Sequence, residues 1–311
     1  AILMMRLPKA GRGILTYRPL TSGKPSRNHF LSAGRPDRIY RNAHIGTPER
    51  NSKMNPVKNP VTIRNVTIGR GRPKICVPIT GQTRPEILKE AGGFSSIPAD
   101  LAEWRADWYE DVFDAEKLAD TAKALREALG ELPLLFTFRT KTEGGEKAAD
   151  DAQYKRLNLS MAESGCADLI DVELFSKETV AEELISAAHE HSVKVIGSSH
   201  DFHSTPSQEE IVKKLCHMQK AGADIAKIAV MPRSEQDVLT LLSATLEMSR
   251  HHADCPVITM SMSETGLISR LAGESFGSAV TFGSASKASA PGQIGVRELR
   301  QVLDIIHGSL G

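Results

Sequence analysis

The residue with the clearest chemical potential is a lysine inside an apolar stretch. The segment "ADIAKIAVMP", Ala223–Pro232, has the small and branched apolar residues of a β-strand, yet Lys227 stands in its middle. Charge is costly to hold in apolar surroundings, so such a site favours a neutral amine. A neutral amine attacks ketones and forms an iminium ion, which acidifies the neighbouring C–H bond. Lys227 is therefore a candidate for imine catalysis.

Imine catalysis also needs a base and a group that holds the substrate. His200 lies in "VIGSSHDFHSTP", and histidine titrates near neutral pH, which suits a residue that moves protons. The chain also carries arginines, whose guanidinium groups bind a carboxylate through two parallel hydrogen bonds. The substrate expected from these residues is a ketone that carries an anionic group.

The elements that would position these residues alternate between strands and helices. A hairpin that turns at Arg64-Asn65 comes first. Strands are then expected over 74–80, 100–107, 132–139, 167–174, 193–199, 223–230, 255–261 and 277–282, and helices over 83–91, 114–129, 150–164, 177–191, 207–221, 234–252, 264–275 and 293–309. Eight such pairs predict an α/β fold, a (β/α)8 TIM barrel. An open doubly wound sheet is the alternative, but no GxGxxG motif follows the first strand.

Strand parity places the polar residues at one end of the barrel. Lys227 shares a face with Ile225 and Ala229, while the alternate residues are apolar enough to pack under helices, so Lys227 should face the barrel interior. The same parity test places further candidate site residues at the C-terminal mouth, where barrel enzymes have their active sites. They are Glu103, Arg105, Arg139, Asp171, Glu173, Ser198, His200, Met260 and Phe282.

Each candidate also has a purely structural interpretation. A lysine–glutamate pair can fill a barrel interior, and His200 can be an ordinary core histidine. His189 and His191 resemble a metal pair, but their place near a helix end fits a solvated surface better. The convergence of a lysine, a histidine, arginines and acids at one end of one barrel favours catalysis.

Composition limits the class of protein. Hydrophobic residues make up 40% and charged residues 25%, which is ordinary for a globular chain. No apolar run reaches the roughly 18 residues of a membrane span, so we expect no membrane association. The four cysteines (Cys76, Cys166, Cys216 and Cys255) form no CxxC pair. They predict reduced thiols in a cytoplasmic protein, without a zinc site.

The charge distribution divides the chain in two. Residues 1–53 hold 11 basic and two acidic residues, a net of +9, whereas the remainder holds 28 basic and 36 acidic residues, a net of −8. We expect a disordered basic extension over 1–53 and a catalytic domain over 54–311. The extension could bind nucleic acid, act as a transit peptide, or be translated upstream sequence with Met54 as the natural start. We favour the last, and the acidic barrel argues against nucleic acid.

Six motifs together resemble one enzyme family. They are "LAEWRAD", "FTFRTKTEGGE", "VIGSSHDFHSTP", "DIAKIAVMP", "ITMSMSETGLISRLAGESFGSAVTFG" and "SKASAPGQI", which follow one another without a large insertion. In these motifs the sequence resembles the type I 3-dehydroquinate dehydratases of the shikimate pathway, from about residue 61 to the end. The resemblance implies dehydration of 3-dehydroquinate to 3-dehydroshikimate through a lysine Schiff base, without cofactor or metal, by a homodimer.

The resemblance also implies roles for single residues. Lys227 would form the imine, His200 would move protons and Glu143 would orient His200. The implied substrate-binding residues, the last three of them in a lid, are Glu103, Arg105, Arg139, Met260, Arg270, Phe282, Ser289, Ala290 and Gln293. Val77 and Pro78 depart from the family pattern, because some members offer a serine there.

A Schiff-base class I aldolase on the same barrel is the alternative enzyme. It would also use a lysine on the sixth strand, but it would need a phosphate site in the loops after the seventh and eighth strands. Gly266 and Gly283 are weak candidates for that site, and Arg270 suits a carboxylate equally well.

The extension should be dispensable. Because residues 1–53 lack the apolar content to join a core, a chain that starts at Met54 should keep full activity and the same thermal midpoint. Enzyme assays and thermal denaturation of the two chains side by side test this. A large loss of either quantity would show that the extension packs on the barrel.

Overall fold

The strands form a parallel, nearly closed barrel. The computed structural model describes residues 57–285 and 290–310. The eight strands are β3 (Lys74–Ile79), β4 (Leu101–Arg105), β5 (Leu134–Thr137), β6 (Leu169–Glu173), β7 (Lys194–Asp201), β8 (Ile225–Val230), β9 (Val257–Ser261) and β10 (Val280–Phe282), and they neighbour one another in the order β10-β3-β4-β5-β6-β7-β8-β9. Between β9 and β10, the Ala279 N–H donates to the Val257 carbonyl at 2.8 Å. The TIM-barrel prediction is confirmed, and the open-sheet alternative is wrong.

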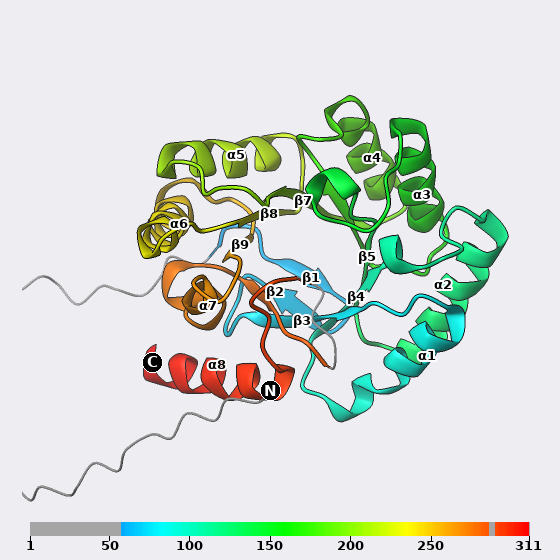
Figure 1. The fold of residues 1–311 in the computed structure, drawn as a ribbon, viewed down its shortest axis with the longest axis horizontal. Helices are drawn as coiled ribbons and strands as arrows, with labels where there is room; N and C mark the ends of the chain where they lie inside the picture. Colours follow the sequence, from blue (N-terminus) through cyan, green and yellow to red (C-terminus); the bar gives the residue numbers. More distant parts are fainter. Residues whose placement is uncertain (1–56, 286–289, 311) are drawn as a thin grey trace, which may run out of the picture. The chain divides into compact units, whose positions relative to one another are not determined.

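Helices surround the barrel (Figure 1). They are α1 (Arg84–Gly92), α2 (Ala115–Leu129), α3 (Asp151–Glu163), α4 (Glu178–Glu190), α5 (Gln208–Lys220), α6 (Glu235–Glu247), α7 (Leu267–Leu271) and α8 (Val296–Leu310). Ser207 caps α5 through a reciprocal bond with Glu210, as its sequence predicts. Within the described ranges, none of the helices has the length and apolar character needed to cross a bilayer.

Two helices are shorter than the sequence predicts. The expected helix over 234–252 changes at Met248 into a π-helical turn that runs to His252. The expected helix over 264–275 is reduced to α7 and a 3-10 turn, Gly273–Phe276. A Cβ on Gly266 would lie 2.2 Å from the Ser261 carbonyl oxygen, so the chain entering α7 packs directly on the end of β9. This close approach places α7 at the mouth of the barrel.

The apolar core has two layers, as strand parity predicts. Ala226, Ile228 and Val230 belong to the layer between the strands and the helices. Ile225 and Ala229 belong to the layer inside the barrel. Lys227 lies between these two in the same strand and is 3% exposed, so its side chain faces the interior.

The predicted hairpin closes the N-terminal end of the barrel. Strands β1 (Val61–Ile63) and β2 (Val66–Ile68) pair in antiparallel fashion around Arg64, which has φ 50°. The buried side chains of the hairpin join the interior layer of the barrel. Arg64 Nε donates to Asp168 Oδ1 at 2.7 Å, and Asp168 precedes the first residue of β6. The hairpin therefore occupies the N-terminal end of the barrel, opposite the polar residues at the C-terminal mouth.

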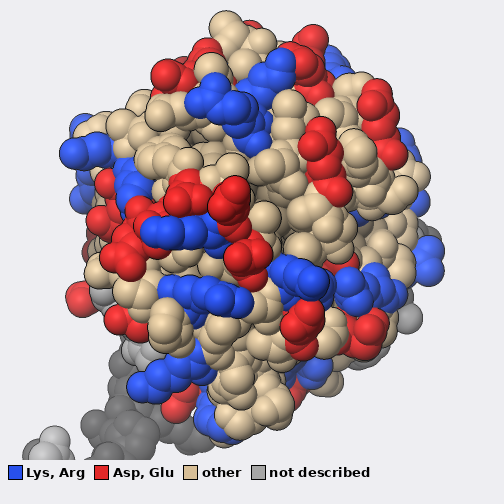
Figure 2. All heavy atoms as spheres, turned by 90° about the vertical axis from the view of Figure 1, so that its right-hand side faces the viewer, with Lys and Arg blue, Asp and Glu red and all other residues tan. Residues whose placement is uncertain are grey.

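Charges are mixed on the side of the barrel formed by α1, α2 and α3. Figure 2 shows lysines and arginines interspersed with acids on this face. On α2, for example, Lys117 and Lys123 alternate with Glu116 and Asp120. A continuous basic surface of the kind that nucleic acid requires is absent from this face of the described barrel. The predicted extension over 1–53 lies outside the described residues and stays a prediction.

Candidate active site

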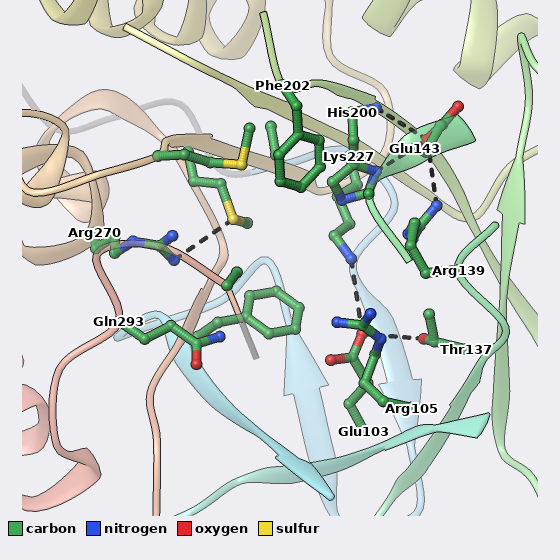
Figure 3. A pocket seen from close by; sticks show the side chains of 16 residues that line it. Glu103, Arg105, Thr137, Arg139, Glu143, His200, Phe202, Lys227, Arg270 and Gln293 are labelled. Carbon is green, nitrogen blue, oxygen red and sulfur yellow. Dashed lines mark hydrogen bonds and ion pairs between the residues drawn. The ribbon is translucent and has the colours of Figure 1, made fainter. Parts of the chain in front are cut away.

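Most of the residues predicted for the C-terminal mouth line one pocket there (Figure 3), whereas Asp171, Glu173 and Ser198 are not among its lining residues. The predicted residues that the structure brings together there are Glu103, Arg105, Arg139, Glu143, His200, Lys227, Met260, Arg270, Phe282, Ala290 and Gln293. Ser289 lies outside the described residues. The pocket thus draws side chains from segments almost 200 positions apart, which only the closed barrel brings together.

The amine of Lys227 faces two carboxylates. Its Nζ lies 3.1 Å from Asp171 Oδ2 and 3.9 Å from Glu103 Oε1. The ring centroid of Phe282 is 4.7 Å away. The amine therefore has charged as well as apolar neighbours, whereas the apolar sequence around Lys227 predicts only the apolar ones. The acids come from β6 and β4, and the sequence around Lys227 carries no information about them.

Arg139 joins the acids behind the pocket into one network. Its guanidinium lies 2.7 Å from Asp171 Oδ1, 3.1 Å from Glu173 Oε1 and 3.3 Å from Glu143 Oε2. Burial alone would lower the pKa of Arg139, but the three carboxylates raise it well above its usual value. Because these acids hold the Arg139 guanidinium in place, its side chain organises the wall of the pocket.

His200 is anchored by Glu143. Both the backbone N–H and the ring Nδ1 of His200 lie 3.0 Å from Glu143 Oε2. Burial lowers the pKa of His200 well below 6.5, and the positive charges of Arg139, Lys227 and Arg105 add to this effect. A neutral imidazole with Nδ1 engaged has Nε2 available as a base. His200 lies within β7 rather than just past its end, as the sequence analysis placed it.

Glu143 is held as firmly as the histidine that it orients. Ser176 Oγ donates to Glu143 Oε1 at 3.0 Å, while Oε2 faces His200 and Arg139. Burial raises the pKa of Glu143 to about 7, against the lowering effect of Arg139. The carboxyl group therefore changes charge in the pH range where a histidine base operates.

Glu103 and Arg105 are fixed on alternate positions of β4. Arg105 donates from Nε and Nη2 to the two oxygens of Asp107, at 2.8 and 2.7 Å. Thr137 Oγ1 donates to Glu103 Oε1 at 3.0 Å. The β4 side of the pocket is preorganised, because both side chains already have hydrogen-bond partners within the protein.

Arg270 is a buried cation without an acidic partner in the described part of the chain. It is 2% exposed, and burial lowers its pKa to about 10. Its Nη2 donates to the Pro291 carbonyl oxygen at 2.9 Å, Nη1 lies 3.6 Å from Met260 Sδ, and Nε has no hydrogen-bond partner. Figure 3 shows Arg270 across the pocket from Glu143 and Arg139. A buried unpaired charge is costly, so this position suits an anionic ligand.

Comparison with known proteins decides the family. The type I 3-dehydroquinase family model matches residues 75–309. The chain belongs to the type I 3-dehydroquinase family. The predicted membership, and with it the predicted hydro-lyase class, is confirmed.

Relatives of this type I 3-dehydroquinase match it over nearly their whole length. The 3-dehydroquinate dehydratase of Clostridioides difficile strain 630 is 51% identical over 254 residues, 82% of this chain and 100% of the relative. That of Listeria welshimeri is 55% identical over 249 residues, 80% of this chain and 98% of the relative.

Solved structures of the family have the same fold. A type I 3-dehydroquinate dehydratase from Clostridium difficile, solved with covalently modified comenic acid, matches with a TM-score of 0.79 and 51% identity, over 81% of this chain and 99% of that one. The 3-dehydroquinate dehydratase of Geobacillus kaustophilus HTA426 matches with a TM-score of 0.79 and 41% identity, over 82% and 99%.

Some lining residues of this type I 3-dehydroquinase were missed by the sequence analysis: Thr137, Gly144, Phe202, Ala229 and Met262. Strand parity could have predicted Thr137, because it lies two residues before Arg139 and therefore on the same face. Phe202 and Met262 follow strand ends, where no periodic signal exists. Strand β3, which carries Val77 and Pro78, contributes no lining residue within the described ranges.

Gly144 explains how the loop after β5 delivers Glu143. It has φ 83°, and an added Cβ would lie 2.2 Å from the Phe202 ring. A glycine is required on both counts, and it lets the loop lie against the residues that follow β7. Glu143 is thereby brought within reach of His200.

The raised pKa of Glu143 predicts a pH-dependent stability. A carboxyl whose folded pKa of about 7 exceeds its ordinary 4.5 stabilises the fold below pH 4.5, and this contribution is lost as the pH rises through 7. The free energy of unfolding of the wild type, minus that of Glu143→Gln, should fall by up to about 3 kcal/mol between pH 4.5 and 8.

Urea denaturation at the two pH values measures this difference. Glu182→Gln on the exposed surface of α4 is the matched control and should keep the wild-type dependence. A difference between wild type and Glu143→Gln that stays constant over the range would contradict the assignment.

Proposed function

We propose that this chain dehydrates 3-dehydroquinate to 3-dehydroshikimate through an imine at Lys227. The observation that carries the proposal is the pocket itself, in which Lys227, the neutral His200 and the unpaired cation Arg270 meet. The substrate has a ketone for the lysine, a carboxylate for the arginine and a proton beside the ketone for the histidine. The relatives, which are 3-dehydroquinate dehydratases, support the same reaction.

Substrate binding follows from the charges of the pocket walls. Arg270 would take the carboxylate, since a guanidinium forms two parallel bonds with it. Glu103, Arg105 and Arg139 would position the ring hydroxyls, while Met260 and Phe282 form apolar walls. Ser289, Ala290 and Gln293 would close over the ligand as a lid, which excludes water from the reaction.

The first chemical step would form the iminium. Lys227 gives up a proton, for which the neutral His200 is an acceptor in the same pocket. The amine then adds to the C3 carbonyl, His200 returns the proton to the carbonyl oxygen, and this oxygen leaves as water, so His200 is neutral again. The positive charge on the nitrogen draws electrons from the ring and acidifies the proton on C2.

The elimination and release would use the same histidine twice. His200 removes the C2 proton to give an enamine, then returns a proton to the C1 hydroxyl, which leaves as water. A water molecule hydrolyses the remaining imine and frees both Lys227 and the product. One water is thus released at imine formation, one at elimination, and one is consumed, for a net loss of one.

The aldolase alternative receives little support. The family membership favours the dehydratase. The same membership supports our proposal that the enzyme acts as a cytoplasmic homodimer, for which sedimentation velocity is the direct test.

Arg270→Lys should weaken substrate binding. An ammonium cannot reproduce the two parallel hydrogen bonds of a guanidinium. The cost should be about 1–3 kcal/mol in kcat/KM, with most of the change in KM. Steady-state kinetics measure it, and Arg250→Lys, exposed and remote from the pocket, is the matched control. Unchanged kinetics in Arg270→Lys would remove this residue from the site.

Substitution of Lys227 and substitution of His200 should block the reaction at different steps. Lys227→Ala should lose nearly all turnover and yield no adduct when 3-dehydroquinate and borohydride are added, because no iminium can form. His200→Ala should lose about 10²–10⁴-fold in turnover, the range for a positioned acid–base group, yet still give the adduct. Mass spectrometry after proteolysis locates the modified residue.

Lys213→Ala, on the exposed surface of α5, is the control for lysine removal and should behave as the wild type. An adduct on a lysine other than Lys227, or full activity in Lys227→Ala, would falsify the proposed chemistry.

A further inference from the structure

One buried acid touches the reactive amine and has no role in the steps above. Asp171, on β6, lies behind the pocket wall rather than among its lining residues. Its Oδ2 lies 3.1 Å from Lys227 Nζ. Its other oxygen, Oδ1, accepts from Arg139 at 2.7 Å and from Ser198 at 2.5 Å. Oδ1 is thus occupied by hydrogen bonds from Arg139 and Ser198, and Oδ2 faces the nitrogen on which the imine would form.

We infer that Asp171 is the counter-ion of the iminium formed at Lys227, and that it keeps this nitrogen protonated until the elimination is complete. The inference rests on the proposed function. Asp171 acts through the lysine nitrogen, without touching the substrate, so it is a positioning residue.

The chemistry requires such a partner. An imine withdraws electrons strongly only while its nitrogen carries a positive charge. In a buried site that charge is costly without a counter-charge, and the nitrogen would release its proton instead. The iminium nitrogen bears the lysine chain, the substrate carbon and one hydrogen. With the substrate in the pocket, that hydrogen can point at Asp171 behind the wall.

The other groups around the amine are less suited. Glu103 is farther, at 3.9 Å, and lines the pocket where the substrate would lie. Arg105 and Arg139 carry the same charge as the iminium. Cys76 from β3 is neutral, since burial raises its pKa well above 9, and burial likewise keeps His200 from β7 neutral.

Asp171 itself is held in the charged form. Burial would raise its pKa, but the positive charges of Arg139 and Lys227 and the hydrogen bond from Ser198 lower it below its usual value. Its negative charge is therefore in place before the substrate arrives. No rearrangement is needed when the iminium appears, which is the condition for effective electrostatic stabilisation.

The experiment is the pH profile of turnover in Asp171→Asn. Asparagine keeps the shape of the side chain and removes the charge. The iminium should then lose its proton at lower pH, so the alkaline limb of kcat should move down by about 1–3 pH units, the effect of one opposite charge at this distance. KM should change little, because Asp171 lies outside the pocket lining. A loss of packing alone would lower kcat without moving this limb.

Two variants separate this role from general effects of removing a buried acid. Glu173→Gln removes another buried carboxylate that is bonded to Arg139 but forms no ion pair with the Lys227 amine in the described residues, and it should keep the wild-type alkaline limb. Glu103→Gln should move the limb less than Asp171→Asn. A profile in Asp171→Asn parallel to the wild type, or a shift confined to Glu103→Gln, would overturn the inference.

A second measurement leaves Asp171 unchanged and so does not depend on how Asp171→Asn folds. In His200→Ala labelled with ε-¹⁵N-lysine, the imine formed with 3-dehydroquinate should accumulate. Its ¹⁵N chemical shift should report a protonated nitrogen at pH 8, and a neutral imine there would overturn the inference.

The proposed function has its own, separate readout. If borohydride yields no Lys227 adduct in the wild type, the imine chemistry itself is wrong. If the adduct forms but the two tests above go against Asp171, only the counter-ion role is lost.

Discussion

The site depends on one buried interaction, the contact of the Arg139 guanidinium with three carboxylates. It ties Asp171 and Glu173 on β6 to Glu143 in the loop after β5. Without the cation, three acids would lie buried near one another, and most would have to bind protons. With it, Asp171 stays charged beside Lys227, and Glu143 remains directed at His200. The lysine and the histidine are thereby held by acids that share one guanidinium.

The pocket also shows how charge is divided between the protein and a ligand. Near Lys227 the positive and negative groups are paired within the protein. At Arg270 the pairing is incomplete, since a backbone carbonyl and a thioether are the partners that the described residues supply. An anion that enters the pocket completes the pairing only at Arg270. Under the proposed function, this asymmetry would orient a substrate that has a carboxylate at one end and a ketone at the other.

The alternation of strand and helix patterns was enough to predict the fold. Strand parity was enough to predict the inward direction of Lys227, Glu103 and Arg105, because the two-residue period is a local property. It could not predict that Asp171 lies 3.1 Å from Lys227, since that distance depends on the register of β6, β7 and β8. The length of α7 was overestimated, because its end depends on packing against β9. Phe202 follows a strand and has no pattern of its own. The roles of single residues came from the family resemblance.

The hairpin packs against the N-terminal end of the described barrel, and the pocket lies at the opposite end, at the mouth. The buried side chains of the hairpin fill the interior below the reactive lysine, and Arg64 fastens it to the strand edge through Asp168. Under the proposed function, substrate and product would both pass through this mouth. A product that keeps the carboxylate would occupy the same arginine as the next substrate, so the two would exclude each other. Each turnover would then begin only after the product of the previous one has left the pocket.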